Sequence, residues 1–485
     1  MAADSTVQVP GFYVNGKWER PEGCTFGMVT NPATGATIAE APYAGEADID
    51  RAVRAAHGAF GKWREVAVVE RVQPLYRYKT LLEKHHAELA GILTRENGKT
   101  AEDARAEVRR SIQMVEVACG MPSLMLGDSL NDVAQGIDCK TIRQPIGVCA
   151  GITPFNFPAM VPMWMWPFAI ACGNTFILKP SEKAPLTATR AVELLDDAGL
   201  PPGVLNLVHG GKQTVDALLR HPLVKAVSFV GSTPVAKYIY ATAAAEGKRV
   251  QALGGAKNHL VAMPDADMPK TVEGIIGSAF GAAGERCLAG SVLVTVGAAA
   301  GPLLDLLVKR TKALVVGDGS EAGVEMGPLV TAEHCRRVAG YIEKGVAEGA
   351  VPLVDGREIK KAGGFFLGPT IFDHVTPEMS IAREEIFGPV LSVMRVETLD
   401  EAIELVNRSP FGNATAIFTA SGKAAREYSS RIEVGMVGIN VGVAAPMAFF
   451  PFAGWKNSFF GDLHAHGKDA VAFYTEQKVV MSRWF

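Results

Sequence analysis

The amino-acid sequence predicts an α/β protein in which parallel sheets are covered by helices on both faces. From residue 145 onward, strand-like and helix-like stretches alternate at the spacing of β–α–β units, which favours parallel strands. The strand-like stretches are continuous runs of Val, Ile, Leu and Phe, as expected for strands that are buried on both faces. The chain has 485 residues, too many for one hydrophobic core, so we expect two or three domains.

The N-terminal part of the chain precedes this alternation. Its first stretches, FYVNGKW and NPATGATIAEAPYA, are typical of short strands and turns. Residues 48–118 predict helices, because apolar residues recur at intervals of three and four with charged residues between them.

Two α/β patterns follow along the chain. The expected strands of the first are PIGVCAGI, TFILKP, GVLNLVHG, AVSFVGS and HLVAMP, and its expected helices lie near 159–171, 185–198, 212–220, 233–245 and 269–283. The second pattern follows Cys287, with a strand at SVLVTV, a helix at GPLLDLLVKRTKAL and strands near 351–354, 390–396 and 414–418.

Two segments differ from this pattern. Residues 124–144 and 468–485 alternate polar and apolar side chains, and the second segment includes aromatic residues. Strands at the edge of a sheet offer unpaired backbone groups to a neighbouring chain. We therefore expect these segments to join the subunits of a homotetramer or homodimer.

One long uncharged segment has to be distinguished from a membrane span. No charged residue occurs between Arg143 and Lys179. Repeated prolines would interrupt a helix there and free backbone groups that lipid cannot satisfy. The sequence therefore favours a buried strand, turn, helix and strand, and we expect no membrane partner.

Composition excludes several other classes of protein. The chain is 48% hydrophobic and 20% charged, with a formal net charge of −3, so no basic surface for nucleic acid is expected. Its seven cysteines are odd in number and form no CxxC pair, which argues against a metal site or a disulfide framework and favours reduced thiols. The N-terminus shows no targeting peptide, so a cytoplasmic location is expected, or the mitochondrial matrix for a processed eukaryotic form.

Cys287 is the first candidate for chemistry, in the stretch FGAAGERCLAG. Most cysteines are small buried hydrophobic residues, and that reading stays open from the residues alone. Two features favour a nucleophile. Glycines nearby allow close backbone approach, and Arg286 supplies positive charge that would favour the reactive thiolate.

Two strand-ending turns could hold phosphate or ribose. FVGSTPVAK places a Gly-Ser-Thr turn before a helix, where free N–H groups can bind an anion, although an ordinary βα turn would look the same. In ILKPSEKAP, Lys179 and Glu182 follow a strand and could reach a ribose or phosphate. The alternative is a helix start with Ser181 as its cap.

Two further turns are ambiguous by themselves. TPFNFP places Asn156 between two prolines, where its amide could donate to an oxyanion or simply favour the turn. REEIFGPV places two carboxylates before Phe387 and a Gly-Pro turn, and could be a charged surface loop.

Taken together, FNFP, KPSE, FVGST, GERC and EEIFGP occur in this order with suitable gaps, and the chain resembles the NAD(P)-dependent aldehyde dehydrogenase superfamily from end to end. The resemblance implies the aldehyde dehydrogenase fold with three parts. These are a Rossmann-like NAD-binding domain (1–123 and 145–255), an α/β catalytic domain (256–460), and small oligomerisation strands (124–144 and 461–485).

The resemblance also implies roles for individual residues. Cys287 would attack the aldehyde, with Asn156 and the Cys287 N–H stabilising the oxyanion. The remaining positions would bind NAD: Lys179 and Glu182 at the adenosine ribose, Gly231 and Ser232 at the pyrophosphate, Glu385 at the nicotinamide ribose, and Phe155 and Phe387 beside the cofactor. Glu182 would disfavour a 2′-phosphate, so NAD is preferred to NADP.

The step after the thioester depends on one absent acid. Most family members carry a Glu just before Leu-Gly-Gly that activates water, and in VQALGGAKNH the matching position is interpreted as Ala252. Alanine cannot accept a proton, so hydrolysis should be slow and a thiol should take the acyl group. The GAKNH stretch and GDLHAHGKDAVAFYTEQK resemble the CoA-acylating methylmalonate-semialdehyde (malonate-semialdehyde) dehydrogenase branch. That branch transfers propanoyl or acetyl groups to coenzyme A after loss of the β-carboxylate.

Such a substrate needs a receptor for its carboxylate. Arg110 on a predicted helix and Arg286 beside the nucleophile are the candidates, with Arg109 as the alternative to Arg110. Two competing functions stay open. One is a hydrolytic NAD-dependent semialdehyde dehydrogenase in which Asp462 orders water, and the other is a catalytically inactive relative.

Overall fold

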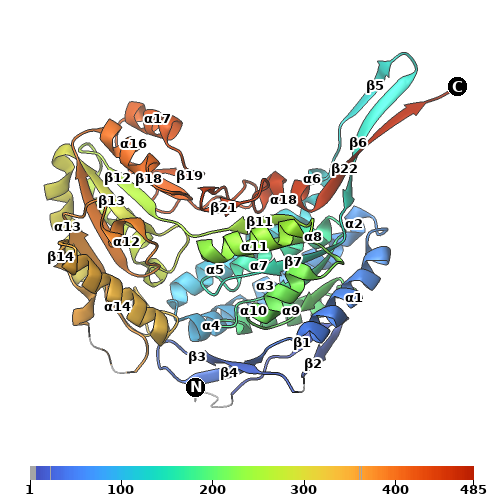
Figure 1. The fold of residues 1–485 in the computed structure, drawn as a ribbon, viewed down its shortest axis with the longest axis horizontal. Coiled ribbons are helices and arrows are strands. Elements are labelled where there is room, and N and C mark those ends of the chain that lie inside the picture. Colours follow the sequence, from blue (N-terminus) through green and yellow to red (C-terminus); the bar gives the residue numbers. More distant parts are fainter. Residues whose placement is uncertain (1–6, 22, 360, 362) are drawn as a thin grey trace.

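The computed structural model describes residues 7–21, 23–359, 361 and 363–485. The expectation about a targeting peptide rests partly on residues 1–6, which lie outside the described part of the chain. Figure 1 shows two lobes joined side by side and a narrow arm that projects from one of them and carries the C-terminus.

The first lobe is built on an eight-stranded sheet. In spatial order its strands are β2 (Lys17–Glu19), β1 (Phe12–Val14), β9 (Leu205–Leu207), β8 (Thr175–Lys179), β7 (Val148–Ile152), β10 (Val224–Val230), β11 (Arg249–Leu253) and β21 (Phe459–Phe460). The five central strands are parallel, and β1 and β21 pair antiparallel at the two sides. Taken in chain order, the central strands run 3-2-1-4-5, as in a Rossmann-like sheet.

The second lobe is built on a seven-stranded sheet. Its strands, in spatial order, are β14 (Val351–Val354), β15 (Thr370–Asp373), β16 (Val390–Val396), β13 (Gly290–Val296), β12 (Asn258–Ala262), β18 (Ala414–Phe418) and β19 (Met436–Ile439). Only β14 pairs antiparallel. The predicted α/β class, with mostly parallel sheets, is therefore confirmed.

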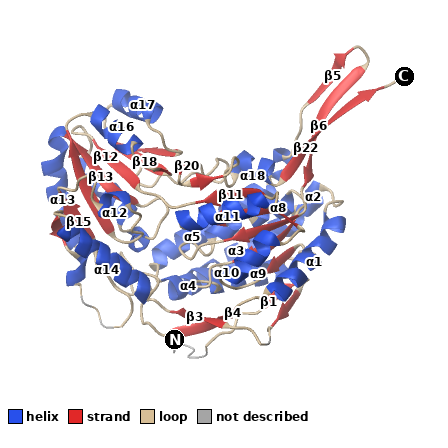
Figure 2. Ribbon diagram, in the orientation of Figure 1, coloured by secondary structure: helices blue, strands red, loops and turns tan. Residues whose placement is uncertain are grey.

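Helices cover both sheets, as Figure 2 shows. In the first lobe these are α1 (Glu46–Trp63), α2 (Val68–Arg71), α3 (Gln73–Lys84), α4 (His86–Asn97), α5 (Ala101–Cys119), α6 (Met121–Leu124), α7 (Met160–Met163), α8 (Trp166–Ala171), α9 (Leu186–Asp197), α10 (Lys212–Arg220) and α11 (Thr233–Ala245). In the second they are α12 (Met268–Ala279), α13 (Ala300–Lys312), α14 (Ala332–Ala347), α15 (Ser380–Arg383), α16 (Leu399–Asn407) and α17 (Gly422–Arg431). Two short pairs complete the body: β3 (Phe26–Thr30) with β4 (Thr37–Pro42), and β17 (Phe411–Gly412) with β20 (Trp455–Lys456).

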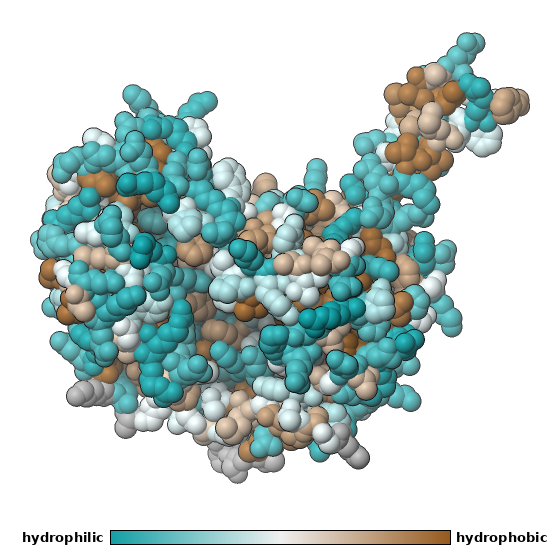
Figure 3. Space-filling view, in the orientation of Figure 1, coloured by the Kyte–Doolittle hydropathy of each residue, from teal (hydrophilic) through white to brown (hydrophobic). Residues whose placement is uncertain are grey.

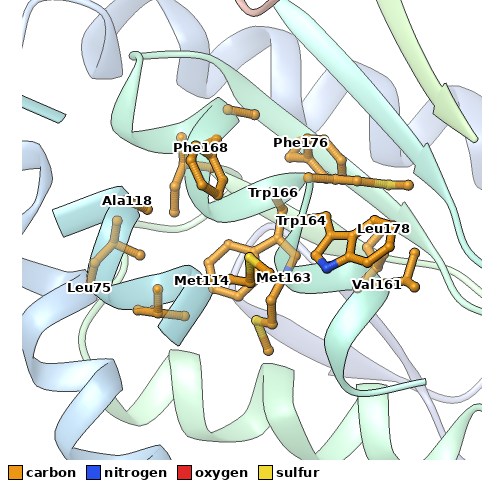
Figure 4. Close-up of a cluster of buried hydrophobic side chains, with 14 of the residues drawn as sticks. Leu75, Met114, Ala118, Val161, Met163, Trp164, Trp166, Phe168, Phe176 and Leu178 are labelled. Atoms are coloured by element: carbon orange, nitrogen blue, oxygen red, sulfur yellow. The ribbon is translucent and has the colours of Figure 1, made fainter. Parts of the chain in front are cut away.

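The uncharged segment 144–178 forms the centre of the largest core. Trp166, Phe168 and Phe176 are fully buried and pack with residues of α3 and α5 (Figure 4). Burying one such side chain contributes roughly 1.5–3 kcal/mol. The segment forms β7, a turn, α7, α8 and β8, as predicted. The described residues contain no helix long and apolar enough to cross a membrane.

The arm is a three-stranded sheet of β5 (Ser129–Ala134), β6 (Ile137–Pro145) and β22 (Thr475–Arg483). The sequence predicted a strand over 468–485. This prediction was wrong for the first part of the segment, because Gly467–Phe473 forms helix α18, which packs against α8. Ala470, Val471 and Phe473 are buried there because their spacing places them on one helical face.

Candidate active site

The predicted site motifs meet between the two sheets. TPFNFP follows β7, KPSE follows β8 and FVGST follows β10, so all three lie at the carboxyl ends of parallel strands. The strand order reverses between β7 and β10, which is where open α/β sheets bind ligands. Cys287 and the EEIFGP motif instead precede β13 and β16, at the amino ends of the second sheet. The carboxyl edge of one sheet therefore faces the amino edge of the other across the site.

The Cys287 loop is held by its backbone. The Cys287 carbonyl accepts hydrogen bonds from the side-chain amides of Asn258 at 2.9 Å and Asn413 at 2.8 Å. Gly284 has φ +72°, and a Cβ there would lie 2.3 Å from the Gly388 carbonyl oxygen. Only glycine therefore lets the GERC loop and the IFGP turn approach this closely.

The Cys287 thiol is half-buried and protonated at neutral pH in this state. Burial raises its pKa to about 12, and the Glu385 carboxylate acts in the same direction. Positive charge on Arg286 opposes this only weakly. The guanidinium of Arg286 instead pairs with Asp103 at 2.6 Å and donates to the Gly277 carbonyl at 3.0 Å. Arg286 therefore favours the thiolate in the predicted direction, but the effect of burial on the Cys287 pKa is larger.

Asn156 is buried beside the GERC loop. Its side-chain amide donates to the Glu285 carbonyl at 2.9 Å, and its own carbonyl accepts from Lys99 Nζ at 2.5 Å. Lys99 is itself buried in an ion pair with Glu107, whose other oxygen accepts the Ala159 N–H at 2.9 Å. Sequence reasoning missed Lys99 and Glu107, which fix the turn that carries the Asn156 amide.

Glu385 rests on the GGAK backbone. Its Oε1 accepts the Ala256 N–H at 2.9 Å, and a Cβ on Gly255 would lie 2.2 Å from Oε2. Phe387, at φ +59°, packs edge-on against Phe155 with ring centroids 5.9 Å apart. His334, which the sequence did not single out, stands beside both rings and lies 2.6 Å from the Phe387 carbonyl through Nε2.

The KPSE turn has a loop conformation. Lys179 is buried and its Nζ donates to the Gly210 carbonyl at 2.8 Å and to Glu182 at 3.3 Å. Helix α9 begins only at Leu186, so the alternative in which Ser181 caps a helix here is wrong. The N–H groups of Leu186 and Thr187 are instead bonded by the buried carboxylate of Glu96 from α4.

The FVGST turn leads into α11 as predicted. Ser232 is the N-cap residue, and its side chain makes no capping bond, so the N–H groups of the first turn are open to an anion. Gly231 donates its N–H to the Leu253 carbonyl at 3.1 Å, and Thr233 Oγ1 accepts the Gly255 N–H at 2.8 Å. FVGST and GGAK are therefore in direct contact.

Arg110 and Arg109 point in different directions from α5. The Arg110 guanidinium is in contact with Met447 and donates to the carbonyls of Ala445 and Pro446 at 3.3 and 3.4 Å. Arg109 is half-exposed and lies 3.7 Å from Glu83. Arg110 is thus the inward-facing member of the pair.

The structure corrects the position at which the family's acid is missing. Ala252 packs in a cluster around Val227 and Phe229, whereas Leu253 packs in the cluster that includes Cys287. Consecutive strand residues face opposite sides of a sheet, so a one-residue offset exchanges the two faces. Leu253, not Ala252, therefore faces the nucleophile side, and it also lacks a proton acceptor. Asp462 is exposed on the surface.

Glu285 provides a pH-dependent prediction. Burial raises the pKa of this carboxyl to about 8, although the Val330 N–H bonds it at 3.3 Å. Its folded-state pKa lies above its unfolded value, so its stabilising contribution is complete below pH 4.5 and is lost as pH rises through 8. Glu285→Gln should therefore raise the melting temperature at pH 8 but not at pH 4.5–5. The free energies of unfolding of the parent and of the Gln variant should diverge by up to about 1.4 kcal/mol per pH unit between about pH 4.5 and pH 8. A constant difference in melting temperature across this range, measured by thermal scans, would contradict this account.

Metal chemistry has no support in the described residues. No group of three or more His, Cys, Asp or Glu side chains among them could hold a metal ion, and each of the seven cysteines is free.

Comparisons with known proteins agree with this geometry. Residues 18–480 match the model of the aldehyde dehydrogenase family. Malonate-semialdehyde dehydrogenase 1 of Bacillus licheniformis is 55% identical over 473 residues, covering 98% of both chains. The crystal structure of methylmalonate-semialdehyde dehydrogenase (DddC) from Oceanimonas doudoroffii superposes with a TM-score of 0.97 at 49% identity, covering 99% of both chains. A candidate methylmalonate-semialdehyde dehydrogenase of Sinorhizobium meliloti, solved with NAD, gives the same TM-score at 46% identity and 99% coverage of both chains. The chain therefore belongs to the aldehyde dehydrogenase family and has its fold.

Proposed function

We propose that this protein is an NAD-dependent, CoA-acylating dehydrogenase of methylmalonate or malonate semialdehyde. The products would be propanoyl-CoA or acetyl-CoA after loss of the β-carboxylate. The observation that carries the proposal is the position of Leu253, an aliphatic side chain in the core cluster against which Cys287 also packs, where a water-activating carboxylate would be needed. The names of its relatives support the substrate class.

Cys287 is the nucleophile of this proposal. Its Sγ forms a bond to the aldehyde carbon, and the thiol proton leaves as the bond forms. The Asn156 side chain can donate to the resulting oxyanion with the hydrogen that its bond to Glu285 leaves free, together with the Cys287 N–H. Lys99 and Glu107 hold the backbone of Asn156 rigid during this step.

The residues present fit a bound NAD. The uncapped N-terminus of α11 suits a pyrophosphate, and Lys179 with Glu182 follows β8, beside the switch point, where an adenosine ribose would rest. Glu385 would accept hydrogen bonds from the hydroxyls of the nicotinamide ribose, with Phe155 and Phe387 packed beside the nicotinamide. When bound, NAD would accept a hydride from the adduct, and loss of this hydride leaves a thioester. The crystal structure of the Sinorhizobium meliloti relative is a complex with NAD, which supports this choice of cofactor.

The Leu253 side chain determines which molecule we expect to take the acyl group from Cys287. General-base catalysis typically contributes about 10²–10⁴-fold, and this contribution is missing for water attack. A thiol brings its own nucleophilicity, so coenzyme A is the proposed acceptor. The test is to follow NADH formation from malonate semialdehyde with and without CoA and to identify the product. Steady formation of free acid at the same rate without CoA would instead establish the hydrolytic alternative.

Arg110 is the proposed receptor for the substrate carboxylate, because Arg286 is neutralised by Asp103. Arg110→Met should raise the KM for malonate semialdehyde by about 10–100-fold, the loss expected for a charge-assisted hydrogen bond. The kinetic constants for propanal, which has no carboxylate, should hardly change. Arg109→Met is the matched control and should behave as the parent enzyme, because Arg109 faces Glu83. An equal loss on both aldehydes would show that Arg110 acts on the fold instead.

The arm is the proposed oligomerisation element. Its strands and the adjoining residues expose several large apolar side chains, which gather on the arm in Figure 3: Leu126, Leu130, Val133, Val479, Met481, Trp484 and Phe485. Exposed apolar side chains on edge strands favour pairing with another subunit. A homodimer or homotetramer is therefore proposed.

A further inference from the structure

A buried ammonium group lies next to the carboxylate that the proposed function assigns to the nicotinamide ribose. Lys257 directly precedes β12 and is 3% exposed. Within the described residues its Nζ is buried and has no hydrogen-bond partner. Burying an ammonium group without hydrogen bonds costs folding free energy, so packing alone gives no reason for a lysine here.

The backbone brings Lys257 to Glu385. Glu385 lies against the two residues before Lys257: its Oε1 accepts the Ala256 N–H, and a Cβ added to Gly255 would lie 2.2 Å from its Oε2. Burial raises the pKa of the Glu385 carboxyl and lowers the pKa of Lys257 to about 7, so burial disfavours both charges. Each charge opposes this effect on the other: Lys257 favours the ionised carboxylate, and Glu385 favours the charged ammonium. Glu384, the other acid that acts on Lys257, already has Tyr341 as a hydrogen-bond donor at 2.7 Å. Glu385 is therefore the natural partner of this ammonium.

We propose that Lys257 is a positioning residue that keeps Glu385 ionised and oriented to accept the hydroxyls of the nicotinamide ribose. This proposal rests on the ribose role of Glu385 in the proposed function. Lys257 acts through Glu385, and its charge raises the affinity of the enzyme for NAD.

The first test compares Lys257→Met and Lys257→Arg with the parent enzyme. NAD affinity is measured by calorimetry on the full chain. The methionine variant should bind NAD about tenfold more weakly, the effect of one pKa unit of charge interaction, and the arginine variant should regain part of this loss. The melting temperature of the methionine variant should not fall, because a buried ammonium group without hydrogen bonds has been removed. Unchanged NAD affinity in the methionine variant would overturn the proposal, whatever the melting temperature.

The second test is a double-mutant cycle with Glu385→Gln. If Lys257 acts through Glu385, Lys257→Met should weaken NAD binding in the parent but hardly at all when position 385 is Gln. An equal loss in both backgrounds would overturn the coupling. The ribose role itself is tested by Glu385→Gln alone, which should bind NAD more weakly. Parental affinity in that variant would refute the proposed function of Glu385 independently of Lys257.

Discussion

Replacing Cys287 with Ser should lower the rate of NADH formation by at least about 10⁴-fold. Serine keeps the shape of the loop, whose anchors are the amides of Asn258 and Asn413 on the backbone carbonyl. Its hydroxyl, however, is a far weaker nucleophile unless a base removes the proton, and loss of a nucleophile removes most covalent catalysis. The measurement is the pre-steady-state burst of NADH with saturating NAD and malonate semialdehyde, which should disappear.

Cys335→Ser provides the matched control. Cys335 is also half-buried, but it lies on α14 with its Sγ 3.8 Å from the Phe366 carbonyl oxygen. This variant should keep the burst and at least about half of the turnover rate. Substitutions of partly exposed residues outside the active site usually change stability little. A burst that survives in the Cys287 variant and vanishes in the Cys335 variant would show that the nucleophile has been misassigned.

Local signals allowed much of the fold to be predicted. The buried strands β7, β8 and β10 were found because mostly apolar runs end in turns rich in Gly, Pro and Asn. Strand β11 was missed because RVQAL begins with charged and polar residues. Helix α14 was missed although Val338, Ile342 and Gly345 share its buried face, since charged residues dominate the rest of that segment.

The site was predictable only where a motif is local. Asn156, Cys287 and Glu385 each belong to a short turn with its own signature, and the fold brings these turns into contact. Lys99 and His334 act through partners 57 and 53 residues away in the chain, so no local pattern could identify them.

The offset at residues 252 and 253 has a similar cause. Gly254, Gly255 and Ala256 are all small, so the sequence alone does not fix which residue before them takes the place of the family's Glu. Side-chain direction along β11 resolves it, because Ala252 pairs with Phe460 and Leu253 with Phe459 in clusters on opposite faces.

Replacing Leu253 with Glu should therefore give the enzyme a hydrolytic activity that it lacks. A carboxylate on the Cys287 side of β11 could take a proton from water attacking the thioester, and such a base typically contributes about 10²–10⁴-fold. Release of free acid without CoA should rise by about this factor. The variant should also melt at a lower temperature, because Leu253 is 3% exposed and a buried carboxylate is costly.

Two further variants separate proton transfer from disturbed packing. Leu253→Gln has nearly the same size and polarity as the Glu variant but cannot act as a base, so it should lose stability without gaining hydrolysis. Ala252→Glu places the acid in the cluster around Val227 and Phe229, on the far side of the sheet, and should also leave hydrolysis unchanged. If Ala252→Glu, and not Leu253→Glu, released free acid without CoA, the face assigned to the nucleophile would be wrong. If all three variants did so, thioester hydrolysis would be limited by water access and not by the missing base.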